Sequence, residues 1–395
     1  MEKRFGVLPV IILVLCGIAL GCVISYSLID RNPSPVSLSA ADGDFAKLKE
    51  IRAYLDYYFV GDLDDQQLLD YAAEGLIAGT GDRWSYYISA DEMDSYQEQM
   101  NNAYVGIGIT IQNNETQDGY SIISITAGSS AEAAGLRPGD ELIAVEGENA
   151  WELGMTETRN RVRGETGTFV TITIRRGRTL TDYTLERKSV ALETVTWKLL
   201  RDNAALICIK NFDANICKDT IAAIEEALDA GAKSLIFDVR NNPGGYQHEL
   251  VQLLDYLLPE GPLFRSSSYD GKVNVEYSDS SCLSMPMAVL VNENSYSAAE
   301  FFAVALQEYE WAAVIGTGTS GKGYFQNTFY LSDGSAIAIS TGEYRTPLDH
   351  SLVGVGIVPD IYLNLDDEDY YNQYYGLLAW EDDEQILAAL EAVKE

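Results

Sequence analysis

VNENSYSAAEFFAVALQEYEWAAVIGTGTSGKGYFQ, residues 291–326, is the stretch that decides the fold of this chain. It begins where the apolar run Met287–Val291 ends, and the apolar residues from Ser297 to Glu310 recur at helical spacing. A second apolar run, Ala312–Ile315, leads into a glycine-rich turn. A strand, a polar turn, a helix and another strand in this order predict an α/β sheet.

Two side chains in this stretch are candidates for chemistry. Ser297 stands at the strand-to-helix turn, where the first N–H groups of the helix have no partners within it and suit a developing anion. Lys322 follows 25 positions later (322 − 297 = 25), on the glycine-rich turn. A lysine whose pKa is lowered by burial can act as the base for a serine. From the residues alone, this pair competes with an exposed lysine in a flexible turn.

Other kinds of site fit the sequence less well. The turn GTGTSGKG, residues 316–323, approaches the phosphate-binding pattern, but Gly323 stands where that pattern needs a hydroxyl, and a strand-like run follows. The two histidines, His248 and His350, are too few for a zinc site. Cys208, Cys217 and Cys282 are scattered and odd in number beyond the N-terminal region. We therefore expect no metal, no cofactor and no disulfide framework.

Composition sets the broad class of protein. The 395 residues suffice for two or three domains, and 47% hydrophobic residues suffice for real cores. The net charge of −33 argues against nucleic acid as a partner, because binding phosphates needs a basic surface.

The N-terminal region, residues 1–30, predicts a membrane segment. Lys3 and Arg4 precede an uncharged stretch from Phe5 to Ile29 that is long enough to cross a bilayer. Positive charge before the span favours a cytoplasmic N-terminus and an exported remainder. We expect an uncleaved single-pass anchor in the cell membrane. A lipoprotein cleaved before Cys22 and a cleaved signal peptide remain alternatives.

Residues 31–102 read as a tether and a helical segment. The tether is rich in proline and serine. Helical patterns then cover Asp44–Tyr58, Asp65–Ala78 and Ala90–Met100, and the turn Gly81–Ser89 carries an aromatic cluster.

Over residues 103–190 the sequence pattern changes from helical to short strand-like runs. The segments YVGIGI, residues 104–109, and AAGLRPGDELIAVEG, residues 133–147, resemble a PDZ domain of the circularly permuted bacterial kind. A PDZ domain binds a peptide as an added strand. The resemblance implies that the turn formed by Val105, Gly106, Ile107 and Gly108 captures the terminal carboxylate. A β-rich interaction domain with another ligand is the alternative.

Residues 191–395 predict a mixed sheet with helices on both faces. Strand patterns at Ala204–Ile209 and Ser234–Val239 alternate with helical patterns at Asp219–Ala230 and Leu250–Leu258. A strand pair is expected around the Asp333-Gly334 turn, and a final helix over residues 383–394. The acidic run 366–369 reads as a solvated connector.

Several segments in this part resemble the carboxy-terminal processing (tail-specific) serine–lysine proteases. They are DVRNNPGG at 238–245, VNENSYSAAEFFAVALQ at 291–307, GTSGKGYFQ at 318–326, DGSAIAIST at 333–341 and YRTP with GVGIVPDI at 344–361. The resemblance implies a multidomain α/β (α+β) protein made of a helical segment, a PDZ domain and a mixed-sheet protease core, which here follow the predicted N-terminal transmembrane helix. It also implies that Ser297 is the nucleophile, Lys322 the general base and Gln326 the residue that orients the lysine. Gly244 or Gly245 would supply an oxyanion N–H.

Two departures from the family pattern stand beside the nucleophile. Ala299 replaces a serine and Tyr296 replaces a small residue, while Ser295 is a rival nucleophile. We expect an exported serine endopeptidase that cleaves proteins near their C-termini, with the PDZ domain recruiting the substrate tail and a homodimer left open. The alternative is a PDZ scaffold whose protease core is degenerate.

Overall fold

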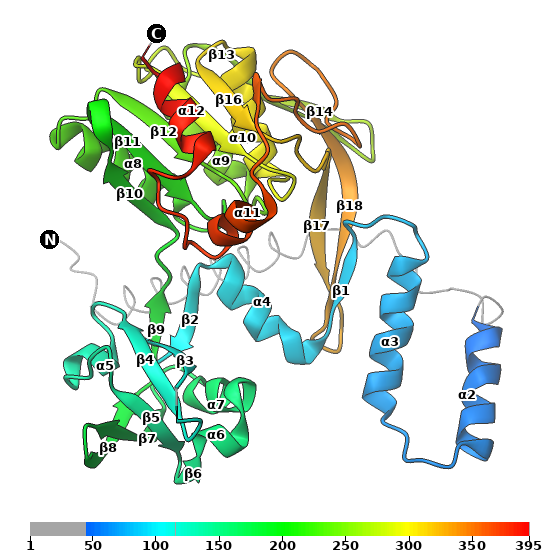
Figure 1. Ribbon diagram of the computed structural model, residues 1–395. Coiled ribbons are helices and arrows are strands. Elements are labelled where there is room, and N and C mark those ends of the chain that lie inside the picture. Colours follow the sequence, from blue (N-terminus) through cyan, green and yellow to red (C-terminus); the bar gives the residue numbers. More distant parts are fainter. Residues whose placement is uncertain (1–44, 115, 395) are drawn as a thin grey trace, which may run out of the picture. The chain divides into compact units, whose positions relative to one another are not determined.

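The computed structural model describes residues 45–114 and 116–394 (Figure 1). The predicted anchor, residues 1–30, lies outside them. No helix within the described ranges is long and apolar enough to cross a membrane. The chain divides into two units, one up to Leu69 and one from Asp70 onward. The first contains α2 (Ala46–Tyr58) and the start of α3 (Asp65–Ala78).

A six-stranded sheet forms the centre of the second unit. Its order is β10-β11-β12-β15-β16-β19, and all pairs are parallel except β10 with β11. The strands are β10 (Val195–Leu199), β11 (Ala204–Ile209), β12 (Ser234–Asp238), β15 (Met287–Val291), β16 (Ala312–Gly316) and β19 (Ile361–Tyr362). The mixed α/β architecture predicted for this part is therefore confirmed.

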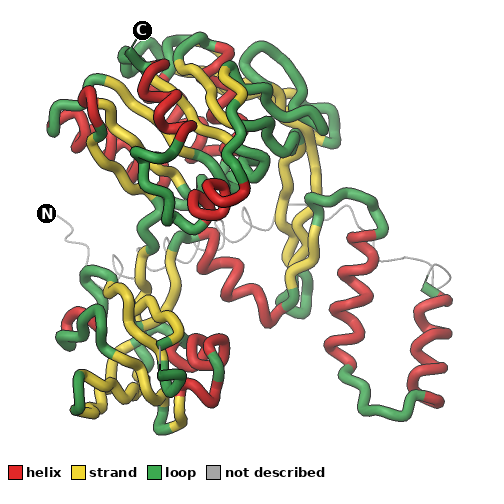
Figure 2. The backbone as a smooth tube through the Cα atoms, in the orientation of Figure 1, coloured by secondary structure: helices red, strands yellow, loops and turns green. Residues whose placement is uncertain are grey.

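Helices cover both faces of this sheet because successive side chains of a strand point to opposite faces. Ile207, Phe237 and Val289 pack with α8 (Ile216–Asp229), α9 (Gln247–Leu257) and α10 (Ala298–Glu308). Leu206 and Ile236, one position away, pack with α12 (Glu384–Ala392) on the other face. Figure 2 shows these helices on either side of the strands.

A second sheet carries the segment that contains the predicted base. It comprises β1 (Tyr86–Ile88), β13 (Gly261–Ser268), β14 (Val273–Ser278), β17 (Tyr324–Tyr330) and β18 (Ala336–Arg345). Strand β18 pairs with β1, β13 and β17, all antiparallel. The prediction of a turn over residues 81–89 is thus wrong in part, because residues 86–88 form an edge strand whose ladder bonds come from β18.

Residues 103–191 form a β domain. Its main sheet has the order β3-β4-β5-β7-β8 with β6 beside β5, and β2 pairs with β9. The strands are β2 (Ala103–Gly106), β3 (Ile109–Asn113), β4 (Tyr120–Ile125), β5 (Glu141–Val145), β6 (Glu148–Asn149), β7 (Phe169–Arg176), β8 (Thr179–Glu186) and β9 (Lys188–Ala191), and the helices are α5 (Ser130–Ala133), α6 (Ala150–Leu153) and α7 (Met155–Val162). The core includes Ile107, Ile122, Leu142 and Ile172.

Two helical segments remain. The 3-10 turn η1 (Ala90–Glu92) and α4 (Met93–Met100) precede the β domain, where one helix was predicted. The acidic run at 366–369 is exposed at residues 366–368, as predicted, but it begins α11 (Asp367–Tyr374) and is not a connector. The Asp366 side chain accepts the backbone N–H groups of Glu368 and Asp369 and so caps this helix.

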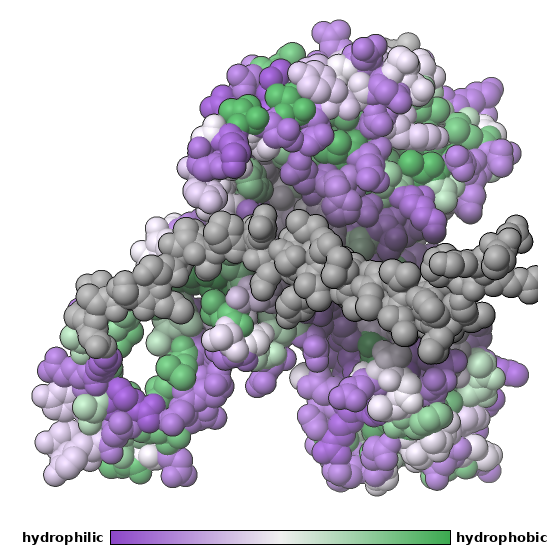
Figure 3. All heavy atoms as spheres, turned by 180° about the vertical axis from the view of Figure 1, so that it is seen from behind, coloured by the Kyte–Doolittle hydropathy of each residue, from purple (hydrophilic) through white to green (hydrophobic). Residues whose placement is uncertain are grey.

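Hydrophilic residues cover most of the face in Figure 3, in keeping with the net charge of −33.

Candidate active site

Ser297 stands between β15 and α10 in a strained backbone conformation. Its φ of 59° and ψ of −123° lie in a region that non-glycine residues rarely adopt. The turn is held by two hydrogen bonds, from the Ser297 N–H to Glu300 Oε2 at 3.1 Å and from the Tyr296 N–H to the Asn242 carbonyl at 3.1 Å. Such a conformation costs about 1–3 kcal/mol, so the surrounding contacts must enforce it.

Ser295, the rival nucleophile, is fixed in the interior. Its side chain is fully buried, and its Oγ donates to the Val239 carbonyl at 2.7 Å and accepts the Asn292 N–H at 3.0 Å. A hydroxyl in this position stabilises the turn and cannot reach a substrate. Ser297 is therefore the only one of the two serines that lines the cavity described below.

The glycine turn after β12 lies directly against Ser297. A Cβ on Gly244 would come within 2.7 Å of the Ser297 Cβ and within 2.8 Å of the Ala298 nitrogen. The Gly244 N–H donates to Asn242 Oδ1 at 2.8 Å. The N–H groups of Gly245 and Ala298 have no acceptor within the described part of the chain. Of the two predicted oxyanion donors, Gly245 is thus the one that is available, and Ala298 supplies a second N–H.

Glu300 joins the serine turn to the lysine turn. It is fully buried on α10 and accepts the N–H groups of Gly321 at 2.7 Å and Lys322 at 2.9 Å, besides that of Ser297. The Thr319 hydroxyl donates to Oε1, the oxygen that also accepts the Gly321 N–H, whereas Oε2 accepts the other two N–H groups. Burial raises the pKa of Glu300, whereas these hydrogen bonds act in the opposite direction.

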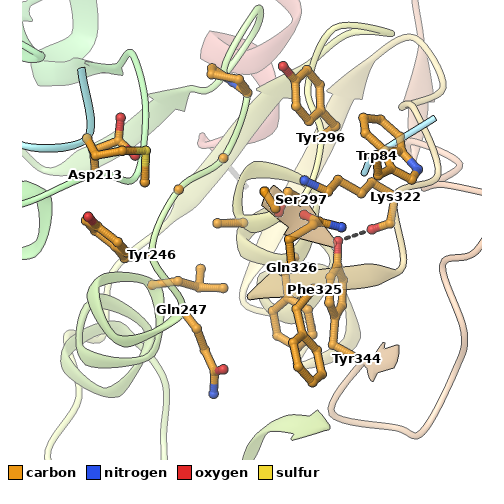
Figure 4. A pocket seen from close by; sticks show the side chains of 18 of the residues that line it. Trp84, Asp213, Tyr246, Gln247, Tyr296, Ser297, Lys322, Phe325, Gln326 and Tyr344 are labelled. Atoms are coloured by element: carbon orange, nitrogen blue, oxygen red, sulfur yellow. Dashed lines mark hydrogen bonds between the residues drawn. The ribbon is translucent and has the colours of Figure 1, made fainter. Parts of the chain in front are cut away.

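The ammonium group of Lys322 lies in an aromatic setting. Nζ is 5.0 Å from the centroid of the Trp84 ring and 5.9 Å from that of Tyr296. In Figure 4 the Lys322 side chain extends toward Ser297, and both rings lie on one side of it. Burial lowers the pKa of Lys322 to about 8, although the charges of Asp82 and Glu300 act to raise it. A substantial fraction of this amine is therefore neutral near physiological pH.

Gln326 is bonded to residues other than the lysine. Its Nε2 donates to the hydroxyl of Ser340 at 3.0 Å, and no hydrogen bond joins it to Lys322 among the described residues. The Ser340 N–H in turn donates to Ser85 Oγ at 3.0 Å, and that hydroxyl donates to Asp82 at 2.6 Å. Gln326 thus belongs to a polar network that reaches the carboxylate whose charge acts on Lys322.

One cavity of about 660 Å³ collects these residues. Its walls include all the predicted protease-site residues, namely Gly244, Gly245, Ser297, Lys322 and Gln326. Trp84 and Asp213 also line it, and the sequence did not indicate them individually. For Trp84, the aromatic cluster in the turn 81–89 was a signal. Tyr344 also lines the cavity, and its hydroxyl donates to the Lys322 carbonyl, as the dashed line in Figure 4 marks.

The four residues predicted to capture a peptide carboxylate lie at the start of the β domain. Val105 and Gly106 belong to β2 and pair with Ser189 and Lys188 of β9. The Val105 N–H already donates to Glu98 Oε1 at 2.7 Å, so it is not available to a peptide. Ile107 is buried, and a Cβ on Gly108 would lie 2.2 Å from that of Ser129. Only glycine fits at position 108.

Across the described ranges, no cluster of His, Cys, Asp and Glu side chains could hold a metal ion. The groups on the cavity wall include a serine hydroxyl, a desolvated amine and two unpaired backbone N–H groups. A nucleophile, a base and oxyanion donors are the components of acyl transfer.

Comparison with known proteins agrees with this chemistry. Residues 203–363 match the model of peptidase family S41, and residues 121–176 match that of a PDZ domain. A "Probable CtpA-like serine protease" of Staphylococcus aureus is 28% identical over 363 residues, which are 91% of this chain and 72% of that protein. Its Staphylococcus epidermidis counterpart is 32% identical over 310 residues, which are 78% of this chain and 62% of that protein.

A solved structure shares the fold. It is a Bacteroides fragilis protein assigned by its name to the S41 proteases, with 17% identity and a TM-score of 0.50. The match covers 86% of this chain and 93% of that one.

Proposed function

We propose, from the premise that this chain belongs to peptidase family S41 and is a serine-type peptidase of the C-terminal processing kind, that Ser297 and Lys322 hydrolyse peptide bonds near the C-termini of proteins. The observation that carries this proposal is the desolvated Lys322, with its pKa lowered to about 8, on the same cavity as Ser297. The amine is a base only when it is neutral, and burial provides that state.

The reaction proceeds in two halves. Neutral Lys322 takes the proton of the Ser297 hydroxyl as Oγ attacks the peptide carbonyl, and the resulting oxyanion is held by the N–H groups of Gly245 and Ala298. The lysine then passes its proton to the leaving amine as the C–N bond breaks, which forms an acyl-enzyme. Water, deprotonated by the same lysine, attacks the ester carbonyl, and the proton returns to Ser297 Oγ as the ester C–O bond breaks and the carboxylic acid product leaves. No cofactor is required for this sequence.

Gln326 acts indirectly in this scheme. Its hydrogen bond to Ser340 and the onward contacts to Ser85 and Asp82 support a role in placing the Asp82 charge near Lys322. That charge favours the protonated amine. The network therefore sets how far the pKa of Lys322 falls.

Recruitment and location complete the proposal. A protease with a PDZ domain acts on proteins, and we assign the capture of the substrate tail to that domain. The charge pattern of residues 1–30 supports a single-pass membrane anchor with the catalytic part outside the cytoplasm. The competing function is a scaffold that binds tails and cuts nothing.

The test is cleavage of an unfolded protein by the purified full-length chain, with products identified by mass spectrometry. S297A and K322A should each abolish cleavage. The matched controls S280A and K218A change an exposed serine and an exposed lysine and should cleave at the wild-type rate. Cleavage retained in K322A would refute the lysine-base mechanism. A wild type that binds tails without cleaving them would support the scaffold.

A further inference from the structure

One carboxyl group on the cavity wall has no part in the mechanism above. Asp213 is only 4% exposed, yet it lines the cavity that holds Ser297. Its carboxylate has no hydrogen bond and no ion pair within the part of the chain that the structure describes. Burial raises its pKa to about 7, with no neighbouring donor or cation to oppose the effect. A desolvated carboxyl without a partner is costly, which calls for a function.

The basic side chains of the cavity wall are all engaged elsewhere. Arg83 donates to a backbone carbonyl at 2.8 Å and stacks on an aromatic ring at 4.3 Å. The carboxylates that act on Lys322 are those of Asp82 and Glu300. His248 is largely exposed and lies 3.6 Å from its neighbour Glu249. Within the described ranges, therefore, no cation compensates the carboxyl on the cavity wall.

Asp213 is close to the reaction centre through the glycine turn. Phe212 forms a bridge with Gly245, and a Cβ on Gly245 would lie 2.6 Å from the Asp213 nitrogen. The preceding glycine abuts Ser297, as described above. In Figure 4, Asp213 and Tyr246 lie across the glycine turn from Ser297. An extended substrate that passes this turn would bring another of its side chains toward Asp213.

Aromatic rings surround this part of the cavity. Tyr86, Tyr96 and Tyr246 line it, and the rings of Tyr86 and Tyr96 are 6.4 Å apart. Burial raises the pKa of Tyr86 and of Tyr246, and the charge of Asp213 adds to both shifts, in keeping with phenols that lie near the carboxyl on the same cavity wall. Apolar walls with a carboxylate suit a long aliphatic stem that ends in a cation.

We propose that Asp213 forms a subsite that selects a lysine or arginine side chain of the substrate, a few residues from the scissile bond. The inference rests on the proposed peptidase function and adds the substrate class. A basic side chain supplies the missing partner, with charge-assisted hydrogen bonds in a water-poor setting. An apolar side chain of equal length fills the same space but leaves the carboxyl unpaired. A site built to pair with a polar group strongly rejects a substrate that lacks that group, so we expect strong discrimination against the apolar side chain.

The experiment uses matched fluorogenic peptides that place lysine, norleucine or glutamate at each position around the scissile bond in turn. Norleucine keeps the aliphatic stem and lacks the charge. We expect one position at which kcat/KM for lysine exceeds that for norleucine by about tenfold or more. In D213N this ratio should fall to about one. D94N makes the same change on the exposed face of α4 and should keep the wild-type ratio.

Thermal denaturation of D213N establishes that the variant is folded, and D213S serves as a second variant if it is not. A wild type with no preference for lysine at any position, or a preference that D213N retains, overturns the subsite alone. A wild type that cleaves neither the peptides nor an unfolded protein overturns the proposed function with it. The two failures are therefore distinguishable.

Discussion

The backbone N–H groups of Ser297 and Lys322 donate to the same oxygen, Oε2 of Glu300, at 3.1 and 2.9 Å. The candidate nucleophile and base are thereby fixed to one buried carboxylate, although they belong to different turns. The turn that holds Ser297 and the turn that holds Lys322 are therefore both bonded to one side chain, that of Glu300.

Replacing Glu300 by glutamine tests this dependence. The E300Q side chain has one acceptor oxygen and an amide group that faces N–H donors, so at least one buried hydrogen bond becomes a repulsive contact. We expect a loss of about 2–4 kcal/mol in the free energy of unfolding and at least a hundredfold lower kcat. Denaturant unfolding and peptide kinetics measure both. E310Q, on an exposed residue just beyond α10, should change neither, and an E300Q enzyme of normal kcat would contradict the role of this carboxylate.

The pH dependence of kcat/KM reports on Lys322. Because only the neutral amine is a base and its pKa is about 8, the rate should rise with pH to a plateau with a midpoint near 8. At pH 7 roughly a tenth of the molecules are active. The D82N variant removes a charge that favours the protonated amine, so its midpoint should move to lower pH. A wild-type rate that is flat between pH 6 and 9 is the result that would be incompatible.

Tyr296 is the departure from the family pattern whose effect can be stated most directly. The centroid of its ring lies 5.4 Å from that of the Trp84 ring, and both rings lie over the amine of Lys322. Y296S lets water reach the amine, which raises the pKa of Lys322 toward its ordinary value. We expect the pH midpoint to move upward and the rate at pH 7 to fall severalfold. Y269S, at a residue that is 80% exposed, is the control. An unchanged midpoint would show that the ring does not exclude water.

Removing the amine should stabilise the fold. The folded pKa of Lys322 is below the unfolded value, so the unfolded chain binds the proton more readily, and the charged amine destabilises the fold at low pH. K322M should therefore raise the free energy of unfolding at pH 7 by about 1–3 kcal/mol while it abolishes cleavage. The gain should shrink as pH rises from 8 toward 10.5, which unfolding curves at several pH values would reveal. A K322M protein that is less stable at pH 7 contradicts the burial of the charge.

Replacing Asp213 should change the free energy of unfolding with the opposite pH dependence to that of Lys322, because its gain grows as pH rises. Its folded pKa, about 7, is above the unfolded value of 3.8, so the folded state keeps a proton that the unfolded chain releases. The carboxyl thus lowers stability progressively as pH rises from about 4 to 7. D213N should be more stable than the wild type by about 2–4 kcal/mol at pH 8 and nearly equal at pH 4. Melting curves at both pH values decide this. A gain that is the same at both would mean that the carboxyl is well solvated.

The local patterns predicted much of the fold. Helix α3 has the predicted bounds Asp65–Ala78, and Ser297 lies at a strand-to-helix turn, because apolar periodicity reports which face of an element is buried. The hairpin β13–β14 was missed because GPLFRSSS shows no alternation, although its partner VNVEYS alternates between apolar and polar residues. The acidic run at 366–369 was misread because charge was weighed above the capping Asp366.

The sequence could not predict the interactions within the site, because they depend on the register of paired strands and on strands that are far apart in the chain. Gln326 was predicted to bond to Lys322, but it lies opposite Ser340 in the β17–β18 ladder and bonds to that residue instead. A one-residue shift would have turned it to the other face. Trp84 reaches the lysine because the adjoining strand β1 pairs with β18, and no local pattern encodes that partner.

The pairing of β1 with β18 also bears on when the protein becomes able to cut. Ser85 and Ser340, 255 positions apart, are joined by a hydrogen bond at the edge of the site. Closing so long a loop is a late and slow event in folding, because its entropy must be overcome before the contact forms. A nascent chain lacks its base until residue 322 has emerged and lacks the strand that holds Trp84 beside it until β18 has followed. The protein would thus be unable to attack its neighbours or itself until synthesis has passed β18 (Ala336–Arg345).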